Sequence, residues 1–165
     1  MLSPGIFLEK ITETFMFHDL IPTSMKLELN EQQKMIRNMV REFAEKEIAP
    51  VAAELDKTGE YPTKILDKMA KLGLLGIIIP QQYGGAGLDT ISYVTVVEEI
   101  SRKCASTGVI TSVHNSLAAW PIMKYGTEEQ KKKYLPILAK GERICAFAGT
   151  EPNAGSDLGA MKTTA

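Results

Sequence analysis

The chain has 165 residues, of which 44% are apolar and 24% charged, and its formal net charge is −1 at pH 7. This length is enough for one domain with a buried core, and the composition is that of an ordinary soluble protein. The near-neutral charge excludes the strongly basic surface with which proteins bind nucleic acid or an anionic membrane. The longest apolar run, at 72–80, is half of the roughly 18 residues that would span a bilayer.

Cysteine and histidine are rare and widely spaced. Cys104 and Cys145 form no CxxC pair, and His18 and His114 stand alone, so we expect no metal site. We expect both cysteines to be free thiols in a reducing, intracellular compartment. The first arginine, Arg37, follows several acidic residues, which argues against a mitochondrial transit peptide.

Residues 1–24 differ from the rest of the chain. Leu8, Ile11 and Phe15 could share one face of a short helix. The alternative, which we favour, is an upstream extension, with the domain beginning at Met25. We therefore predict that residues 1–24 can be deleted without loss of the fold.

The first predicted helix begins after Asn30, because Asn30 and Gln33 form a capping-box pattern. We expect Pro50 to break or kink this helix, since proline lacks the amide and crowds the preceding turn. The apolar residues that recur at helical spacing are Met35, Ile36, Met39, Val40, Phe43 and Ala44.

A second helix is predicted from Thr63 to Leu72, with Gly73 as its stop and Ile65, Leu66 and Met69 on its core face. The stretch "IPQQYGGAGLD" that follows contains three closely spaced glycines. A GGxG pattern is weak evidence for phosphate binding, and we favour a connector between helices.

Two further helices are predicted between residues 89 and 124. Asp89 caps the first, whose core face we assign to Ile91, Val94, Val97 and Ile100, away from Glu98, Glu99, Arg102 and Lys103. Residues 105–124 are apolar on most faces, which is typical of a central helix in a bundle. Their polar side chains either line a cavity or find partners within the helix. His114 has no charged orienting partner nearby in sequence, which argues against a catalytic base.

Thr127 and Gln130 form another capping box, and the helix that they open ends at Gly141. The lysines at 131–133 are expected to be solvated. "RICAFA" then predicts a strand over Ile144–Ala148. The core is predicted to include Met35, Val40, Phe43, Leu66, Met69, Val97, Ile100 and Leu117.

The segment "AGTEPNAGSD", residues 148–157, is rich in small and polar residues. It offers the amides of Ala154, Gly155 and Ser156 and the hydroxyls of Thr150 and Ser156. Such a set suits a flat polar ligand edge or a phosphate oxygen. A plain turn capped by Asp157 is the alternative.

The segment "TEPNAGSD", preceded by an apolar strand, resembles the flavin-binding signature of the acyl-CoA dehydrogenase family. Four further segments resemble the N-terminal helical domain of that family in the same order. They are "REFAEKEIAPVAAELDKTGEYP", "LGLLGIIIPQQYGGAGLD", "VEEISRKCASTGVITSVHNSL" and "YGTEEQKKKYLPILAKGE". The likeness covers residues 25–165, and the wording of residues 104–117 is most similar to short-chain, butyryl-type members.

The resemblance implies an all-α fold. It would comprise an N-terminal extension at 1–24, the helical bundle at 25–142, and the first strand and loop of a central β-domain at 143–165. We therefore expect an N-terminal fragment of the enzyme that by itself is inactive and binds FAD weakly or not at all. The alternative is a stand-alone helical interaction domain without catalysis.

The resemblance also implies roles for individual residues. Thr150 would hydrogen-bond the polar edge of the flavin, and Ser156 would lie near the phosphates and the thioester substrate. Residues 107–117 would border the acyl-chain pocket. Gly149 departs from the family, which usually has a branched apolar residue there. The residues implied to bind FAD are Phe147, Ala148, Gly149, Thr150, Glu151, Pro152, Asn153, Ala154, Gly155 and Ser156.

The implied reaction is α,β-dehydrogenation of an acyl-CoA thioester, in which a carboxylate removes the α-proton and the β-hydrogen leaves as hydride to flavin N5. The family's catalytic glutamate lies in a C-terminal bundle, so we assign no catalytic residue here, and Glu98, Glu99 and Glu151 are not candidates. The implied partners are the acyl-CoA substrate, electron-transfer flavoprotein and further copies of the chain in a homotetramer. The implied location is the bacterial cytoplasm, or the mitochondrial matrix in a eukaryote.

Overall fold

The computed structural model describes residues 28–164 of the chain. The predicted extension at 1–24, with Leu8, Ile11 and Phe15, lies outside the described residues. The chain divides into two units, residues 1–30 and residues 31–165. The helices that the structure describes and the candidate site lie in the second unit.

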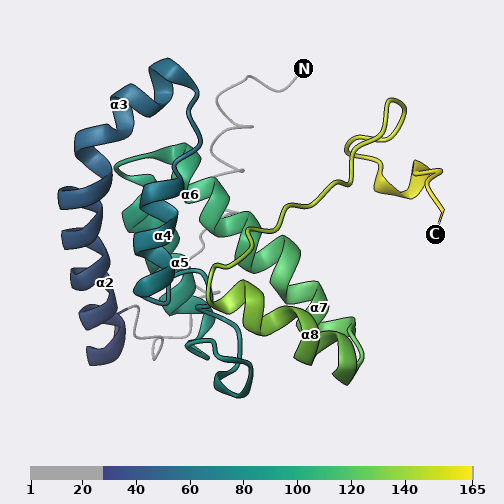
Figure 1. Cartoon of the computed structure of the whole chain (residues 1–165), viewed down its shortest axis with the longest axis horizontal. Coiled ribbons are helices and arrows are strands. Elements are labelled where there is room, and N and C mark those ends of the chain that lie inside the picture. The colour runs from purple at the N-terminus through teal and green to yellow at the C-terminus, as the bar shows by residue number, and fades with distance from the viewer. Residues whose placement is uncertain (1–27, 165) are drawn as a thin grey trace, which may run out of the picture. The chain divides into compact units, whose positions relative to one another are not determined.

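The second unit is helical, and no strand is formed among the residues that the structure describes, so the all-α prediction is confirmed. Helix α2 lies along α5, α5 packs on α6, and α7 packs beside α8 (Figure 1). The helical segments, in order, are α2 (Glu31–Phe43), a π-helical stretch (Ala44–Ile48), α3 (Ala49–Thr58), α4 (Thr63–Lys71), a 3-10 turn (Gln81–Tyr83), α5 (Thr90–Ser101), α6 (Ala105–Ser112), a second π-helical stretch (Val113–Ala119), α7 (Trp120–Tyr125), α8 (Glu128–Ala139) and a last 3-10 turn (Leu158–Ala160).

Pro50 was predicted to break or kink the first helix, and it does not break it. The backbone stays helical to Thr58, and Pro50 lies in the first turn of α3. Just before it, the Ala49 amide donates to the Ala44 carbonyl, five residues back instead of four. This wider turn changes the hydrogen-bonding register ahead of the proline, so that Pro50 sits where a missing amide is tolerated.

A first core cluster joins α2, α4 and α5. Its buried members include the predicted core residues Val40, Phe43, Leu66, Met69 and Ile100. Three other predictions are wrong: Met35 is 71% exposed, Leu117 is 45% exposed, and Val97 is only half-buried. On α2 the buried side chains are Gln33, Val40 and Phe43, which leaves Met35 and Met39 exposed.

Helix α5 is rotated from the predicted orientation. Ile91 and Val94 are exposed, whereas the buried face consists of Ser92, Thr95, Val96, Glu99 and Ile100. The polar members of this face have partners: the Thr95 hydroxyl donates to the Ile91 carbonyl at 2.8 Å, and Glu99 binds an arginine. Burial of a polar group is tolerated once its hydrogen bonds are made, so apolar spacing alone gave the wrong face.

The arginine is Arg41 on α2, whose Nε and Nη2 donate to the Glu99 carboxylate at 3.0 and 2.7 Å. The Glu99 side chain is 4% exposed, and hydrogen bonding from Arg41 lowers the pKa of this carboxyl. More than two turns back along both helices, the Gln33 side-chain amide donates to Asp89, the N-cap of α5, at 2.9 Å. Two side-chain bridges therefore fix the register of α2 on α5.

Several predicted helix ends are confirmed. The Asp89 carboxylate accepts from the Ser92 amide at 2.7 Å, and Thr127 and Gln130 form both halves of the capping box that opens α8. In the connector, Gly85 lies directly against the backbone of Ile79, whose carbonyl oxygen would be 2.1 Å from a Cβ at position 85. The connector prediction is thus supported by a close backbone approach that only glycine allows.

A second core cluster lies around α8. Its buried members are Ile79, Tyr83, Ala119, Leu135, Leu138 and Ala139, and Cys145 packs at its margin. The cluster brings the end of α8 against the second π-helical stretch, and the candidate site begins at this point.

Candidate functional site

The segment of interest, residues 143–164, leaves α8 through a left-handed turn. Gly141 has φ +68°, and a Cβ at this position would lie 2.6 Å from the Ala70 Cβ. The Glu142 amide donates to the Ile137 carbonyl at 3.0 Å, which closes the helix end. The turn sets the direction in which the segment departs from the helices.

A buried histidine holds the start of the segment. His114 is fully buried in the second π-helical stretch, and its Nδ1 lies 3.2 Å from the Cys145 amide nitrogen. Its Nε2 lies 3.2 Å from the Leu138 carbonyl oxygen at the end of α8. Burial lowers the pKa of His114, partly offset by the Leu138 and Leu75 carbonyls, so the neutral ring is favoured.

The predicted strand at Ile144–Ala148 is wrong for the described part of the chain. Residues 144–150 run without helix or strand, and the sole β-bridge recorded there joins Glu151 to Ala154. A strand requires a neighbour for its backbone groups, and no described segment lies alongside. Ile144 and Cys145 pack against the two core clusters, whereas Ala146, Phe147 and Ala148 are exposed.

Phe147 and Gly149, two of the predicted flavin residues, lie in contact. A Cβ on Gly149 would be 2.6 Å from the Phe147 ring, so the ring folds over the glycine. Phe147 is itself 54% exposed. The space beside Gly149 is therefore covered by an aromatic ring from two residues earlier.

Residues 151–154 form a tight turn. The Glu151 amide donates to the Ala154 carbonyl at 2.9 Å, and the Ala154 amide donates to the Glu151 carbonyl at 3.1 Å. Pro152 and Asn153 are exposed at its tip, and Ala154 is buried. The Ala154 amide, predicted to be available for a ligand, is thus used within the turn.

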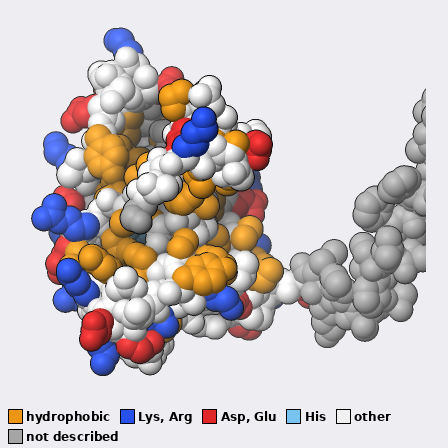
Figure 2. Space-filling view, turned by 90° about the vertical axis from the view of Figure 1, so that its right-hand side faces the viewer, with side chains coloured by type: hydrophobic (Ala, Val, Ile, Leu, Met, Phe, Trp, Pro, Cys, Tyr) orange, Lys and Arg blue, Asp and Glu red, His pale blue; other side chains and the backbone are white. Residues whose placement is uncertain are grey.

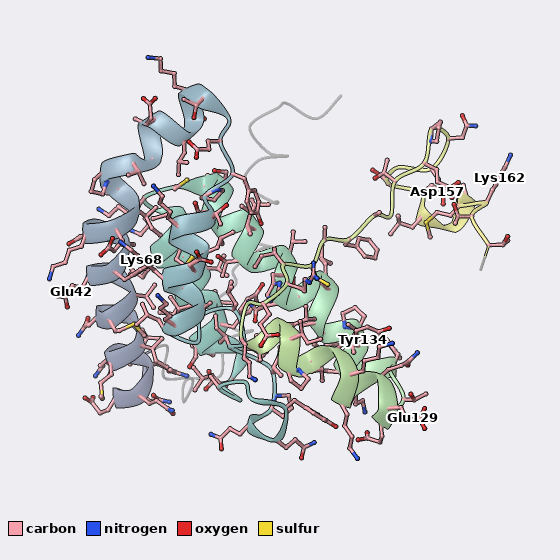
Figure 3. The ribbon with its side chains drawn as sticks, viewed as in Figure 1. Glu42, Lys68, Glu129, Tyr134, Asp157 and Lys162 are labelled. Carbon is pink, nitrogen blue, oxygen red and sulfur yellow. The ribbon has the colours of Figure 1, made fainter. Side chains whose placement is uncertain are left out.

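The Glu151 side chain closes the loop from the other side. Its carboxylate accepts from the Lys162 amide at 2.9 Å, the Thr163 amide at 2.8 Å and the Thr163 hydroxyl. These hydrogen bonds lower the pKa of Glu151. Asp157 and Lys162, labelled in Figure 3, precede and follow the 3-10 turn at Leu158–Ala160 in the chain.

Four of the five polar groups predicted to face a ligand stay open. Within residues 28–164, no hydrogen bond is recorded for the Gly155 and Ser156 amides or the Thr150 and Ser156 hydroxyls, and all three residues are exposed. A Cβ at Gly155 would meet nothing within 4 Å. The loop therefore presents two amides, two hydroxyls and little bulk, which fits the polar edge or phosphate of a flavin nucleotide.

A separate hollow of about 540 Å³ lies between α5, the second π-helical stretch and α7. Ile78, Leu88, Trp120 and Met123 supply apolar walls, and Asp89, Thr90, Tyr93 and Ser116 supply polar ones. Of residues 107–117, only Ser116 lines it, because Thr107, Thr111, His114 and Asn115 are buried within the bundle. Sequence reasoning missed Tyr93 and Trp120, since neither belongs to a motif.

Further apolar side chains are exposed on α7, α8 and the following segment, among them Trp120, Tyr125, Tyr134 and Phe147. Figure 2 views the molecule from the side on which α7 and α8 lie in Figure 1 and shows hydrophobic side chains in the middle of that face, with charged ones around them. Exposed apolar area of this kind is typical of a surface that contacts another domain or a ligand.

Residues 28–164 give no support for a metal site or a membrane span. No group of three or more His, Cys, Asp or Glu side chains among these residues is placed to hold a metal ion. Helices both long and apolar enough for a bilayer are likewise absent from this part of the chain. Cys104 and Cys145 are both free thiols, the first buried and the second half-buried.

The sequence matches the family model described as "Acyl-CoA dehydrogenase, N-terminal domain" over residues 30–142. It is also 52% identical, over 141 residues, to the short-chain specific acyl-CoA dehydrogenase of Clostridium acetobutylicum. That alignment covers 86% of this chain and 37% of the relative. The chain thus spans little more than a third of the length of the relative.

Solved structures give the same picture. Butyryl-CoA dehydrogenase from Megasphaera elsdenii superposes with a TM-score of 0.79 at 37% identity, over 84% of this chain and 37% of that one. An acyl-CoA dehydrogenase complexed with FAD from Bacillus anthracis gives a TM-score of 0.77 at 37% identity. The superposition covers 82% of this chain and 23% of that one. A chain in a structure of the electron transferring flavoprotein of Acidaminococcus fermentans gives a TM-score of 0.81 at 48% identity. The superposition covers 85% of this chain and 37% of that one.

Proposed function

Because this chain belongs to the acyl-CoA dehydrogenase family through its N-terminal domain, we propose that it serves in the flavin-dependent α,β-dehydrogenation of short-chain acyl-CoA thioesters, as part of a full-length enzyme. The observation that carries the proposal is the open loop at 150–156, with its two amides and two hydroxyls, on a bundle that superposes on a butyryl-CoA dehydrogenase. The short-chain preference rests on the relative named for it.

FAD would be held by residues 147–156. The Thr150 hydroxyl and the Gly155 and Ser156 amides are among the donors that the loop leaves open, and the Phe147 ring over Gly149 offers an apolar side. Bound FAD would supply the acceptor for the hydride that leaves the substrate. The Glu151 carboxylate, engaged with Lys162 and Thr163, shapes the loop and is not available to the ligand.

The acyl chain would lie along the 540 Å³ hollow beside α5 and α7. Its apolar walls suit a short alkyl chain, and Ser116 would be the contribution of residues 107–117. Ser156 would contact the thioester arm of the substrate, because it is exposed next to the open Gly155 amide.

Glu98, Glu99 and Glu151 do not suit the role of the base, and Asp89, which lines the hollow, is engaged by the Ser92 amide and the Gln33 side chain. Arg41 holds the Glu99 carboxylate, three donors hold Glu151, and both pKa values are lowered. Glu98 lies on the exposed side of α5, 3.8 Å from Arg102. We therefore expect this chain by itself to catalyse no dehydrogenation of butyryl-CoA.

The partners in this proposal are the acyl-CoA substrate, electron-transfer flavoprotein and three further copies in a homotetramer. Electron-transfer flavoprotein is proposed because the A. fermentans structure named for that protein contains a chain similar to this one. The bacterial cytoplasm or the mitochondrial matrix is the proposed location.

The proposal predicts weak binding of FAD to the isolated chain. Three hydrogen bonds at a net value of about 1 kcal/mol each give roughly 3 kcal/mol. This is less than the roughly 4 kcal/mol that corresponds to a millimolar dissociation constant. Binding is therefore expected only at millimolar FAD or above.

The test is a titration of the ¹⁵N-labelled chain with FAD, followed by amide chemical shifts. We expect FAD to shift the amides of Thr150, Gly155 and Ser156, and Thr150→Val to weaken binding about two- to tenfold through the loss of one hydrogen bond. Thr58→Val, at the exposed end of α3, is the matched control and should leave binding unchanged.

Two results would overturn the proposal. Shifts confined to residues outside 147–156 at saturating FAD, or none at all, would favour a helical interaction domain without catalysis. Micromolar binding, or dehydrogenation of butyryl-CoA by this chain alone, would show that the site is more complete than the described contacts indicate.

A further inference from the structure

The geometry around His114 fixes the position of its ring proton. The Cys145 backbone amide can only donate, so His114 Nδ1 accepts this hydrogen bond. The proton therefore resides on Nε2, which donates to the Leu138 carbonyl. The two ring nitrogens thus face two different segments with opposite hydrogen-bonding roles.

The segment that receives this contact has few others. Among the described residues, the Cys145–His114 bond is the one hydrogen bond recorded for residues 143–150. The apolar contacts of the same segment to the core clusters come from Ile144 and Cys145. Directly beyond, Ala146, Phe147 and Ala148 are exposed.

We propose that His114 is a positioning residue for the loop at 147–156, because it fixes the point from which the loop departs through the hydrogen bond from the Cys145 amide to Nδ1. The Nε2 bond to Leu138 orients the ring for this purpose and ties it to the end of α8. The consequence of this positioning for flavin binding rests on the proposed function, whereas the positioning of the loop itself does not.

Two single substitutions distinguish the roles of the two ring nitrogens of His114. His114→Asn places a side-chain oxygen near the position of Nδ1 and keeps the acceptor for Cys145. His114→Gln places an amide nitrogen near the position of Nε2 and keeps the donor to Leu138. Each variant loses one hydrogen bond of the wild type, so a purely structural role predicts the same effect for both.

The first readout is hydrogen exchange of the Cys145 amide in the full chain. We expect exchange in His114→Asn to stay within about twofold of wild type and in His114→Gln to be about tenfold faster, with amide shifts at residues 146–150 in the second variant alone. The Cys145 thiol should become more reactive in the same variant, with the buried Cys104 thiol as the internal control. Equal behaviour of the two variants would overturn the inference.

A measurement on the unmodified chain applies even if a variant fails to fold. Long-range ¹H–¹⁵N NMR should show Nδ1 as the unprotonated ring nitrogen of His114 and a coupling from the Cys145 amide across the hydrogen bond. A protonated Nδ1 would overturn the inference.

The last readout is FAD binding. We expect His114→Gln to weaken it several-fold and His114→Asn to leave it near wild type. If the wild-type chain does not bind FAD while Cys145 exchange still separates the variants, the proposed function fails and the positioning role stands. If FAD binds equally to both variants, the loop is not positioned for flavin by His114.

Discussion

Replacing Ile100 with alanine tests the orientation of α5 in the bundle. Ile100 is fully buried in the first core cluster. The substitution removes three carbon atoms, worth about 0.8 kcal/mol each in transfer free energy, and leaves a cavity. We therefore expect the free energy of unfolding to fall by about 2–5 kcal/mol, the range seen for such changes in cores.

Val94→Ala is the matched control, because Val94 lies on the same helix and is 53% exposed. Its effect should stay within about 0.5 kcal/mol. Urea denaturation followed by circular dichroism measures both values. For a chain of this length about 1 kcal/mol corresponds to roughly 2–4 °C in Tm, so a thermal scan should separate the variants by several degrees. If Val94→Ala costs as much as Ile100→Ala, the face assigned to α5 is wrong.

Three further predictions concern other parts of the fold. Burial lowers the pKa of His114, so as the pH falls below about 6.5 the unfolded chain takes up a proton at this histidine more readily than the folded chain does. The free energy of unfolding should therefore decrease as the pH falls below about 6.5. Urea denaturation at a series of pH values measures this decrease. His114→Asn should remove this contribution, and an unchanged pH profile in the variant would contradict it. Gly85→Ala should destabilise the chain by at least about 1–3 kcal/mol in the same assay, because its Cβ would strike the Ile79 carbonyl, whereas Gly155→Ala should have no effect on stability. Thr127→Ala should lower the free energy of unfolding by about 1 kcal/mol through loss of the α8 cap, and Thr127→Ser should restore it; equal loss in both would argue against the cap.

The helix boundaries were predictable because they depend on local chemistry. Asp89 and Thr127 cap α5 and α8 with hydrogen bonds that span three residues, and Gly141 ends α8 in a left-handed turn. Neighbours in the chain are sufficient for such signals. The continuation of the helical backbone from α2 through Pro50 into α3 was not predictable, since it depends on a π-helical turn that no residue type indicates.

The faces of the helices depend on partners far away in the chain. Glu99 is buried because Arg41, 58 residues earlier, neutralises it, and this pairing turns Val94 outward. In the loop, small residues and hydroxyls indicated ligand binding, and the Gly155 and Ser156 amides are indeed open. The loss of the Ala154 amide to a turn, and the link from Cys145 to His114, 31 residues earlier, required the folded chain.

The second π-helical stretch, Val113–Ala119, bears on how the length of this chain can vary. The Trp120 amide donates to the Asn115 carbonyl, five residues back, so the turn holds one residue more than an α-helical turn. Removing one residue from a regular α-helix rotates everything after it by about 100°, which would turn α7 away from α8. Within 113–119 the same deletion converts the wide turn into an ordinary one and keeps α7 in phase with α6. Residues 105–125 form one continuous helical path of α6, this stretch and α7. The π-helical stretch is therefore the place on that path where chain length can change by one residue while the packing of α7 on α8 is preserved.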